Sequence, residues 1–589
     1  MINALPPAAV FIMGAFLIPF LKGRLKSFYM LALPAIAYLN LLFLPAGHSW
    51  KIRFLDYLLV FCKVDRLSLV FGYVFILVTF IGIVYALRVK DDAQHIAAFC
   101  YAGGTLGVTF AGDLFSLYVF WEIMAISSVF LILAQRTEKA RSTAFRYFMW
   151  HFFGGLCLLA GIILYVSTRG TIEIGYIGLS DPATYLILIG FCLNATIFPF
   201  HAWLPDAYPR ATVTGAVFMS ALTTKSAVYI LARTFPGTPI LIWAGAFMTC
   251  FPIFYALISN DMRRVLSYSL INQIGFMVCG IGIGTQLAIN GAVAHAVCHV
   301  LYKALLFMST GAVLHMTGKI RATDLGGLYK TMPFTALCCI IGAASISALP
   351  LFSGFISKSM ILVAVAEKHQ VIVWCMLLFA SAGVFHYIGI RVPYFVFFGQ
   401  DSGIRAQEPP FNMRIAMGIA AFICIFLGVY PAPLYNILPY AVDYEPYTAF
   451  HVVGMLQVLM FGALAFIILI RSGVYPVALR AINLDTDWFF RMPGRAFIKF
   501  CERPLKALGR VMDSFVLSIA AGFRSSPAAS VQIENRFDKF FHGALTSLPS
   551  LIFNWIRPFK SEISQLSWNL IYILVPFIIL LFTLLILSI

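Results

Sequence analysis

Long runs of apolar residues, each of about 18 positions or more, recur along nearly the whole chain. Each run is long enough to cross a bilayer as an α-helix, whereas a β-barrel would show short segments of alternating polarity. The pattern predicts an all-α polytopic membrane protein with about sixteen transmembrane helices. Their expected limits are 4–21, 27–46, 66–87, 95–112, 114–134, 145–167, 183–200, 211–232, 239–258, 265–286, 288–312, 332–356, 371–390, 413–430, 450–470 and 567–588.

Two of these spans are interrupted by proline and glycine, at 199–205 and at 350–354. The interruptions occupy corresponding places in two stretches of the chain, 95–233 and 239–391. Paired interrupted helices in two halves are typical of transporters built from inverted repeats. We therefore expect an internal structural repeat, although it is not visible as sequence identity.

The composition supports the membrane assignment and excludes other classes. Charged residues make up 11% of the 589 positions and apolar residues 61%, whereas soluble domains carry roughly 25% charged residues. The net charge of +17 therefore does not indicate a nucleic-acid partner. Lysine and arginine gather in alternate loops, which by the positive-inside rule puts the N-terminus outside the cytoplasmic membrane. These loops are 22–26, 88–90, 136–141, 263–264, 319–330 and 391–405.

The stretch 471–566 differs from the rest because it is basic and carries apolar residues at helical spacing. It predicts an amphipathic lateral segment on the cytoplasmic face, although prolines such as Pro493 and Pro504 should kink it. The alternative is a solvated basic tail. The expected divisions are N-terminal helices 1–94, a first half-channel 95–235, a second half-channel 236–400, C-terminal core helices 401–470, the lateral segment 471–566 and a final transmembrane helix 567–589.

The sequence predicts no cofactor and no metal site. Most of the 12 cysteines stand alone within apolar runs, and the adjacent pair Cys338–Cys339 lacks the partners of a zinc or iron–sulfur site. The glycines Gly280, Gly282 and Gly284 do not follow a strand, so they do not form a dinucleotide loop. If electrons or ATP drive the protein, another subunit must handle them.

Ionisable residues inside the spans are the candidate functional residues, because a charge at the bilayer centre costs at least about 2.5 kcal/mol. Glu122 lies in the middle of a span, where a packing carboxylate is the competing interpretation. Lys225 lies about two turns from a span end, so its ammonium could instead reach the interface. Lys358 follows the second interruption, where a position in an outer loop is the alternative. His151 and His386 have aromatic neighbours, and we expect them to be satisfied core histidines.

The most specific group is His295, His299 and Lys303. Their spacing of four residues puts all three on one face of a helix, over about 12 Å at 1.5 Å per residue. Side chains that bind and release protons at such intervals can relay protons through bridging water. A zinc site would need further ligands, which no nearby carboxylate or H-E-x-x-H pattern supplies.

Five sequence motifs carry a resemblance to a known family, and they lie within 100–400. They are DLFSLYVFWEIMAISS, FPFHAWLPDAYPRATVTGAVFMSALTTKSAVY, NDMRRVLSYSLINQIGFM, AHAVCHVLYKALLF and LPLFSGFISKS. Together they resemble the antiporter-like subunits shared by respiratory complex I, membrane-bound hydrogenases and Mrp-type cation/proton antiporters. The likeness is to the D-type member of the Mrp antiporters, with a C-terminal extension similar to chain 5 of complex I. It implies a core of fourteen helices with two inverted five-helix repeats.

The resemblance also assigns roles to individual positions. Glu122 matches the family glutamate of helix five, Lys225 a lysine of helix eight, and Lys358 the lysine of helix twelve. His295, His299 and Lys303 match the relay of helix eleven. Asn194 stands where the family usually has the lysine that partners the glutamate. Either Lys225 takes over as that partner, or the first half-channel is altered or inactive.

The leading hypothesis is a proton-translocating subunit of a multisubunit membrane complex, with protons moving through paired half-channels and a Glu/Lys/His relay. Its partners would be other membrane subunits and the lipid bilayer, with no nucleic acid. One alternative is Na⁺/H⁺ exchange in an Mrp-type assembly, and another is a structural or coupling subunit with an impaired first half-channel. An independent solute carrier is a weaker alternative, because no pocket signature beyond the ionisable row appears.

Overall fold

The computed structural model describes residues 5–45, 47–54 and 57–473, together with a few positions between 485 and 514. Within these residues, 11 helices are long and apolar enough to cross a membrane, and two shorter apolar helices accompany them. The predicted class, an all-α polytopic membrane protein, is confirmed. Most of the predicted lateral segment 471–566 and the whole final helix 567–589 lie outside the described residues.

The N-terminal part contains an element that the hydrophobic pattern did not predict. Between its second and third helices the chain forms an antiparallel hairpin, in which Ser49 pairs with Lys63 and a bulge follows Trp50. Polar and apolar residues alternate along the first strand, as suits a strand with two different faces, whereas the second strand is mostly apolar. The elements are α1 (Pro7–Ala15), α2 (Gly23–Phe43), β1 (Ser49–Phe54), β2 (Tyr57–Lys63) and α3 (Arg66–Ala86).

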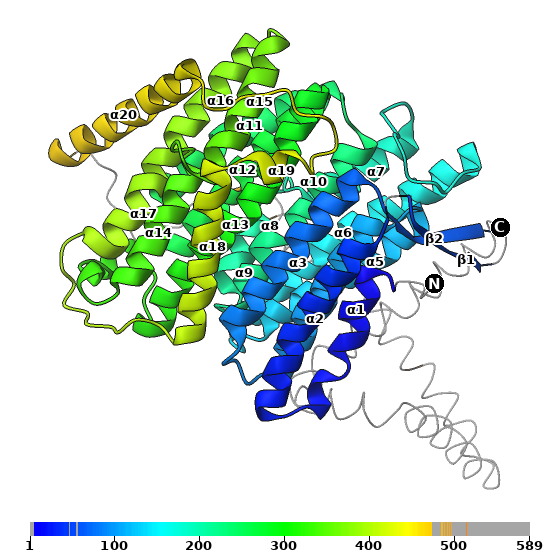
Figure 1. Cartoon of the computed structure of the whole chain (residues 1–589), viewed down its shortest axis with the longest axis horizontal. Coiled ribbons are helices and arrows are strands. Elements are labelled where there is room, and N and C mark those ends of the chain that lie inside the picture. The colour runs from blue at the N-terminus through cyan, green and yellow to red at the C-terminus, as the bar shows by residue number, and fades with distance from the viewer. Residues whose placement is uncertain are drawn as a thin grey trace. The chain divides into compact units, whose positions relative to one another are not determined.

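Two successive groups of helices follow, and the predicted interruptions occur in both (Figure 1). The first group is α4 (Asp92–Phe110), α5 (Leu114–Leu133), α6 (Glu138–Arg169), α7 (Pro182–Asn194), α8 (Trp203–Ala207), α9 (Gly215–Ala221) and α10 (Thr223–Thr234). The second is α11 (Pro239–Ile258), α12 (Met262–Ile283), α13 (Gln286–Thr317), α14 (Pro333–Ile346), α15 (Ser353–Glu367), α16 (Val371–Val384) and α17 (Arg391–Pro393), with π-helical turns on either side of α17. The chain breaks between α7 and α8, and again between α14 and α15.

The helix ends are fixed by local sequence. The Asp65 and Asp113 side chains accept hydrogen bonds from backbone amides of the first turns of α3 and α5, which satisfies donors that have no partner inside the helix. At the other end, Gly170 and Gly318 adopt the left-handed conformation that closes α6 and α13. Three further helices complete the described chain: α18 (Phe411–Val429), α19 (Ala432–Tyr435) and α20 (Ala449–Arg471).

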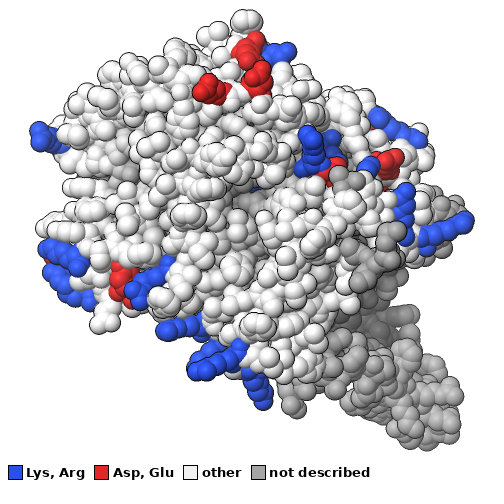
Figure 2. Space-filling model, viewed as in Figure 1, with Lys and Arg blue, Asp and Glu red and all other residues white. Residues whose placement is uncertain are grey.

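The centre of the fold is formed by α9–α10, α12 and α13. Nearly every residue in the apolar windows of these helices is buried, whereas only 17% of the window of α20 is buried. Figure 2 shows the corresponding surface: charged side chains gather toward opposite margins, and a broad uncharged surface lies between them. Such a surface suits the hydrocarbon core of a bilayer. The central helices are therefore the ones that can hold ionisable groups away from lipid.

Candidate functional site

The relay predicted on one helix face lies in the buried centre of the fold. His295, His299 and Lys303 follow one another on α13, and the side chains of all three are fully buried. The two imidazole rings have their centroids 6.2 Å apart. The Lys303 ammonium donates to the Ser269 hydroxyl and, at 3.2 Å, to the Leu266 carbonyl oxygen of α12.

His295 joins α13 to two neighbouring helices. Its Nδ1 lies 2.9 Å from the Ser357 hydroxyl of α15, and its Nε2 lies 3.4 Å from the Tyr302 hydroxyl. The Tyr302 hydroxyl donates to Gln273 Oε1 of α12 at 3.1 Å. Because that hydroxyl proton is directed to Gln273, the His295 Nε2 carries the hydrogen and Nδ1 accepts from Ser357.

His299 is different, because neither of its ring nitrogens has a hydrogen-bond partner among the described residues. Both nitrogens are buried, and buried polar atoms are almost always satisfied by protein groups or ordered water. An imidazole in this state is ready to bond to a mobile donor or acceptor. His299 is therefore the member of the predicted relay whose ring nitrogens are both left without a partner by the described residues.

Lys358 lies at the second interruption, and it is fully buried instead of lying in an outer loop. Its Nζ donates to the Ile346 carbonyl oxygen at 2.7 Å and lies 5.0 Å from the centre of the Phe276 ring. Ile346 is the last residue of α14, so its carbonyl has no partner within that helix. The break thus provides the acceptor that holds the Lys358 ammonium.

Lys225 belongs with this group and does not reach the interface. Its side chain is fully buried on α10, where Nζ donates to the Ser220 carbonyl oxygen at 2.6 Å and to the Thr224 hydroxyl at 3.1 Å. It interacts electrostatically with His299 and Lys303. We call the five residues Lys225, His295, His299, Lys303 and Lys358 the central row.

Glu122 lies apart from the central row. Its Oε1 is buried and has no partner among the described residues, and no hydrogen bond or ion pair in that part of the chain joins it to Lys225. The carboxylate lies against Gly155 of α6, where an added Cβ would collide with Oε1. The structure therefore brings five of the six candidate residues together and leaves Glu122 on α5.

Asn194 is the final residue of α7, directly before the first interruption. It is fully buried, and neither its amide nitrogen nor its amide oxygen has a hydrogen-bond partner among the described residues. The Thr196 hydroxyl, two residues further on, is buried and unpartnered as well. Polar groups left unpaired at a helix break indicate a place that admits water or another polar group.

Several polar residues of the site were not singled out from the sequence. Tyr302 lies seven residues after His295 on the same face of α13, so helical spacing could have revealed it. Gln273 lies within one of the family-like motifs, but the motif assigns it no role. Asp485 could not have been found: it accepts from His201 Nε2 at 3.1 Å and from the Tyr268 hydroxyl at 2.7 Å, and no local pattern links these positions.

The contact of Asp485 joins the start of the C-terminal stretch to the first interruption. Burial acts to raise the pKa of Asp485, but the hydrogen bonds from His201 and Tyr268 outweigh it and hold that pKa below its usual value. The Thr486 hydroxyl adds a contact to the Pro199 carbonyl oxygen at 3.4 Å. Asp485 is therefore an anionic anchor between α12 and the interrupted segment.

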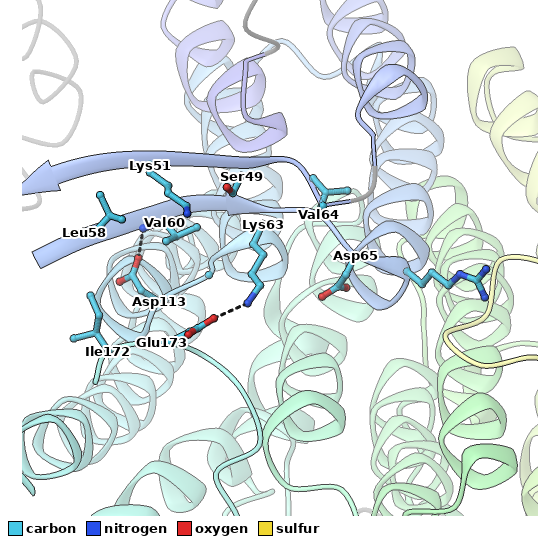
Figure 3. A pocket seen from close by; sticks show the side chains of 13 residues that line it. Ser49, Lys51, Leu58, Val60, Lys63, Val64, Asp65, Asp113, Ile172 and Glu173 are labelled. Atoms are coloured by element: carbon cyan, nitrogen blue, oxygen red, sulfur yellow. Dashed lines mark hydrogen bonds and ion pairs between the residues drawn. The ribbon is translucent and has the colours of Figure 1, made fainter. Parts of the chain in front are cut away.

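A cavity of about 640 Å³ lies under the hairpin, away from the central row (Figure 3). Its lining includes Lys63, which pairs with Glu173 at 2.9 Å, and Asp113, whose Oδ2 accepts from the Val60 amide at 2.6 Å. The first contact ties the hairpin to the loop after α6, and the second ties it to the start of α5. None of the central row residues lines the cavity.

Comparison with known proteins assigns the chain to a family. Residues 111–385 match the family model described as NADH:quinone oxidoreductase/Mrp antiporter, TM. The D subunit of a Na(+)/H(+) antiporter from Alkalihalophilus pseudofirmus is 31% identical over 361 residues, which are 57% of this chain and 73% of that relative. The chain belongs to this antiporter family. The resemblance inferred from the sequence motifs is confirmed.

Solved structures show the same fold for this family member. A chain of the Mrp complex from Dietzia sp. DQ12-45-1b matches with a TM-score of 0.74 at 25% identity, over 88% of this chain and 62% of that one. A chain of the membrane-bound sulfane sulfur reductase, an archaeal respiratory membrane complex, matches with a TM-score of 0.69 at 23% identity, over 93% and 100% of the two chains. This chain spans about half the length of some longer curated relatives.

Proposed function

We propose that this chain is a proton-translocating subunit of a multisubunit complex in the cytoplasmic membrane, with its N-terminus outside. The observation that carries the proposal is the central row: five fully buried titratable side chains on α10, α13 and α15. Buried ionisable groups are expensive in a membrane protein and mark ion pathways. The family's occurrence in the Mrp and respiratory complexes named above supports a role among partner subunits.

The row has the properties that proton transfer requires. Lys225, Lys303 and Lys358 carry like charges when protonated, and Lys303 interacts electrostatically with both of the other lysines. A proton that arrives at one lysine therefore favours release from the next. Because Lys358 is bonded to the end of α14, we place the exit of the path at this second interruption.

Vesicles that contain the intact complex provide the test. Lys303→Met removes the titratable amine and keeps most of the side-chain volume, so we expect the initial rate of proton pumping to fall by about tenfold or more. Lys368→Met is the matched control, because Lys368 is exposed at the end of α15. Wild-type pumping by an assembled Lys303→Met complex would contradict the proposal and favour a structural or coupling role.

Na⁺/H⁺ exchange is the second candidate, because the relative from Alkalihalophilus pseudofirmus is named as part of a Na(+)/H(+) antiporter. Vesicles with an imposed pH gradient separate the two functions. Dissipation of that gradient on sodium addition, with no redox substrate present, supports exchange. Proton pumping that needs a redox substrate and ignores sodium supports a redox-driven complex.

A further inference from the structure

His151 on α6 is a buried histidine with one free ring nitrogen. The side chain is 1% exposed, and its Nδ1 lies 2.9 Å from the Tyr147 carbonyl oxygen. A carbonyl oxygen can only accept, so Nδ1 carries the hydrogen and Nε2 keeps its lone pair. Nε2 is buried and has no hydrogen-bond partner among the described residues. His151 can therefore take up a proton at Nε2 without breaking its bond to the helix backbone.

The surroundings of His151 connect it to Glu122. Gly155 lies one turn further along the same face of α6, and the Glu122 carboxylate rests against that glycine. The Arg146–Asp206 ion pair, at 2.8 Å, lies more than a turn away in the opposite direction along α6 and leaves those charges paired. Among the described residues, Glu122 Oε1 is thus an unpartnered carboxylate oxygen that rests against α6 one helical turn from His151.

His151 also lies beside the helix end that carries Asn194. Its ring centroid is 4.6 Å from that of Trp203, and Trp203 Nε1 donates to the Leu193 carbonyl oxygen at 3.1 Å. Leu193 directly precedes Asn194 and packs near Gly154 of α6. Trp203 therefore links the histidine to the residue directly before the position at which the family resemblance expects a lysine and this chain has an amide.

Hydroxyl groups continue from His151 toward the central row. The Tyr147 ring packs on His151 with centroids 4.0 Å apart, and the Tyr147 hydroxyl lies 2.8 Å from the Ser128 hydroxyl. The Thr223 hydroxyl acts on the Tyr147 hydroxyl as well and lies 2.5 Å from the Tyr101 hydroxyl. Thr223 begins α10 and precedes Lys225 by two residues. Side chains able to bond a proton or a water molecule thus extend from α6 to the start of α10, the helix that carries the first lysine of the row.

We propose that His151 carries protons between Glu122 and Lys225, in place of the titratable side chain that Asn194 does not provide. Nε2 accepts a proton from the Glu122 side, which gives an imidazolium. The same nitrogen then releases the proton toward Tyr147, Thr223 and Lys225, while Nδ1–H stays bonded to the Tyr147 carbonyl. The inference rests on the proposed function, because it supplies the first half of the same path.

Two variants separate proton transfer from a structural role. In His151→Asn the side-chain amide can keep the hydrogen bond to the Tyr147 carbonyl, but no atom of asparagine occupies the place of Nε2. In His151→Gln the amide reaches toward Nε2 but does not titrate. We expect both to lower the initial pumping rate of the assembled complex by about tenfold or more. A residue needed only for its bond to the helix backbone would tolerate Asn, and a residue needed for packing would lower the thermal stability of the complex as well. His369→Asn, at an exposed histidine, is the matched control.

Asn194→Lys is expected to restore pumping to the His151→Asn variant. A lysine at the end of α7 restores a titratable group, so pumping should return to within about threefold of wild type in the double variant with His151→Asn. An assembled double variant that stays inactive overturns the inference, and so does wild-type pumping by either single variant. If those variants pump while Lys303→Met does not, only the role of His151 fails; if Lys303→Met pumps, the proposed function fails.

Discussion

Gly155→Ala is a substitution that moves the Glu122 carboxylate without removing it. An alanine Cβ at this position would collide with Glu122 Oε1 and lie 3.1 Å from Cδ. The colliding atoms are the far end of a flexible side chain, so Glu122 can rotate away while α5 and α6 keep their packing. The substitution therefore tests the place of the carboxylate and not its charge.

The unfolding free energy and the pumping rate should respond differently to Gly155→Ala. Replacing glycine by alanine inside a helix gains about 0.5–1 kcal/mol, and forcing Glu122 off its rotamer costs about 0.5–1.5 kcal/mol. The net change in unfolding free energy should therefore stay within about 1 kcal/mol. A displacement of about 1 Å can cost up to about a hundredfold in a positioned reaction, so we expect pumping to fall by about tenfold or more.

The assay measures pumping in vesicles beside the thermal stability of the purified complex. Gly454→Ala is the matched control, because Gly454 lies within α20 and an added Cβ there meets nothing within 4 Å. We expect Gly454→Ala to leave pumping unchanged and to change the stability by no more than the gain of about 0.5–1 kcal/mol that alanine brings to a helix. Wild-type pumping by Gly155→Ala would refute the reasoning that Glu122 works from its place against Gly155.

Three further outcomes follow from the same geometry. Lys358→Met should stop pumping in vesicles yet leave co-purification with partner subunits intact. If this variant still pumped, the proton path would not include Lys358 at the second interruption. Gly354→Ala should impair assembly, measured by co-purification, because its Cβ would lie 2.9 Å from the Ser345 carbonyl carbon and backbone cannot rotate away; normal yield would contradict this. Asp485→Ala should lower stability by about 2–5 kcal/mol, since it leaves the His201 and Tyr268 donors unpaired, and an unchanged melting temperature would show that the anchor is not needed.

The sequence predicted the features that depend on local spacing. His295, His299 and Lys303 are four residues apart, and any α-helix places such residues on one face. The proline and glycine positions likewise predicted where two helices stop, and the structure breaks them after Asn194 and Ile346. These inferences succeeded because the backbone geometry of one helix determines them.

The remaining features depend on contacts between distant segments. A partnership of Lys225 with Glu122 was one of two alternatives, and in the structure Lys225 interacts electrostatically with His299 and Lys303. His151 was expected to be a satisfied core histidine, and only the packing shows that its Nε2 has no partner in the described part of the chain. The Asp485 contact spans 284 positions from His201. Spacing within one helix contains no information about such pairs.

The interruption after α14 also links the backbone to the charge of Lys358. A continuous helix would have used the Ile346 carbonyl in its own hydrogen-bond ladder, and the break releases that oxygen to the ammonium. When Lys358 gives up its proton, the negative end of the α14 dipole loses its cation. The geometry of the helix break and the protonation state of Lys358 therefore change together. A substitution that made α14 continue past Ile346 would remove the acceptor of the Lys358 ammonium without changing Lys358 itself.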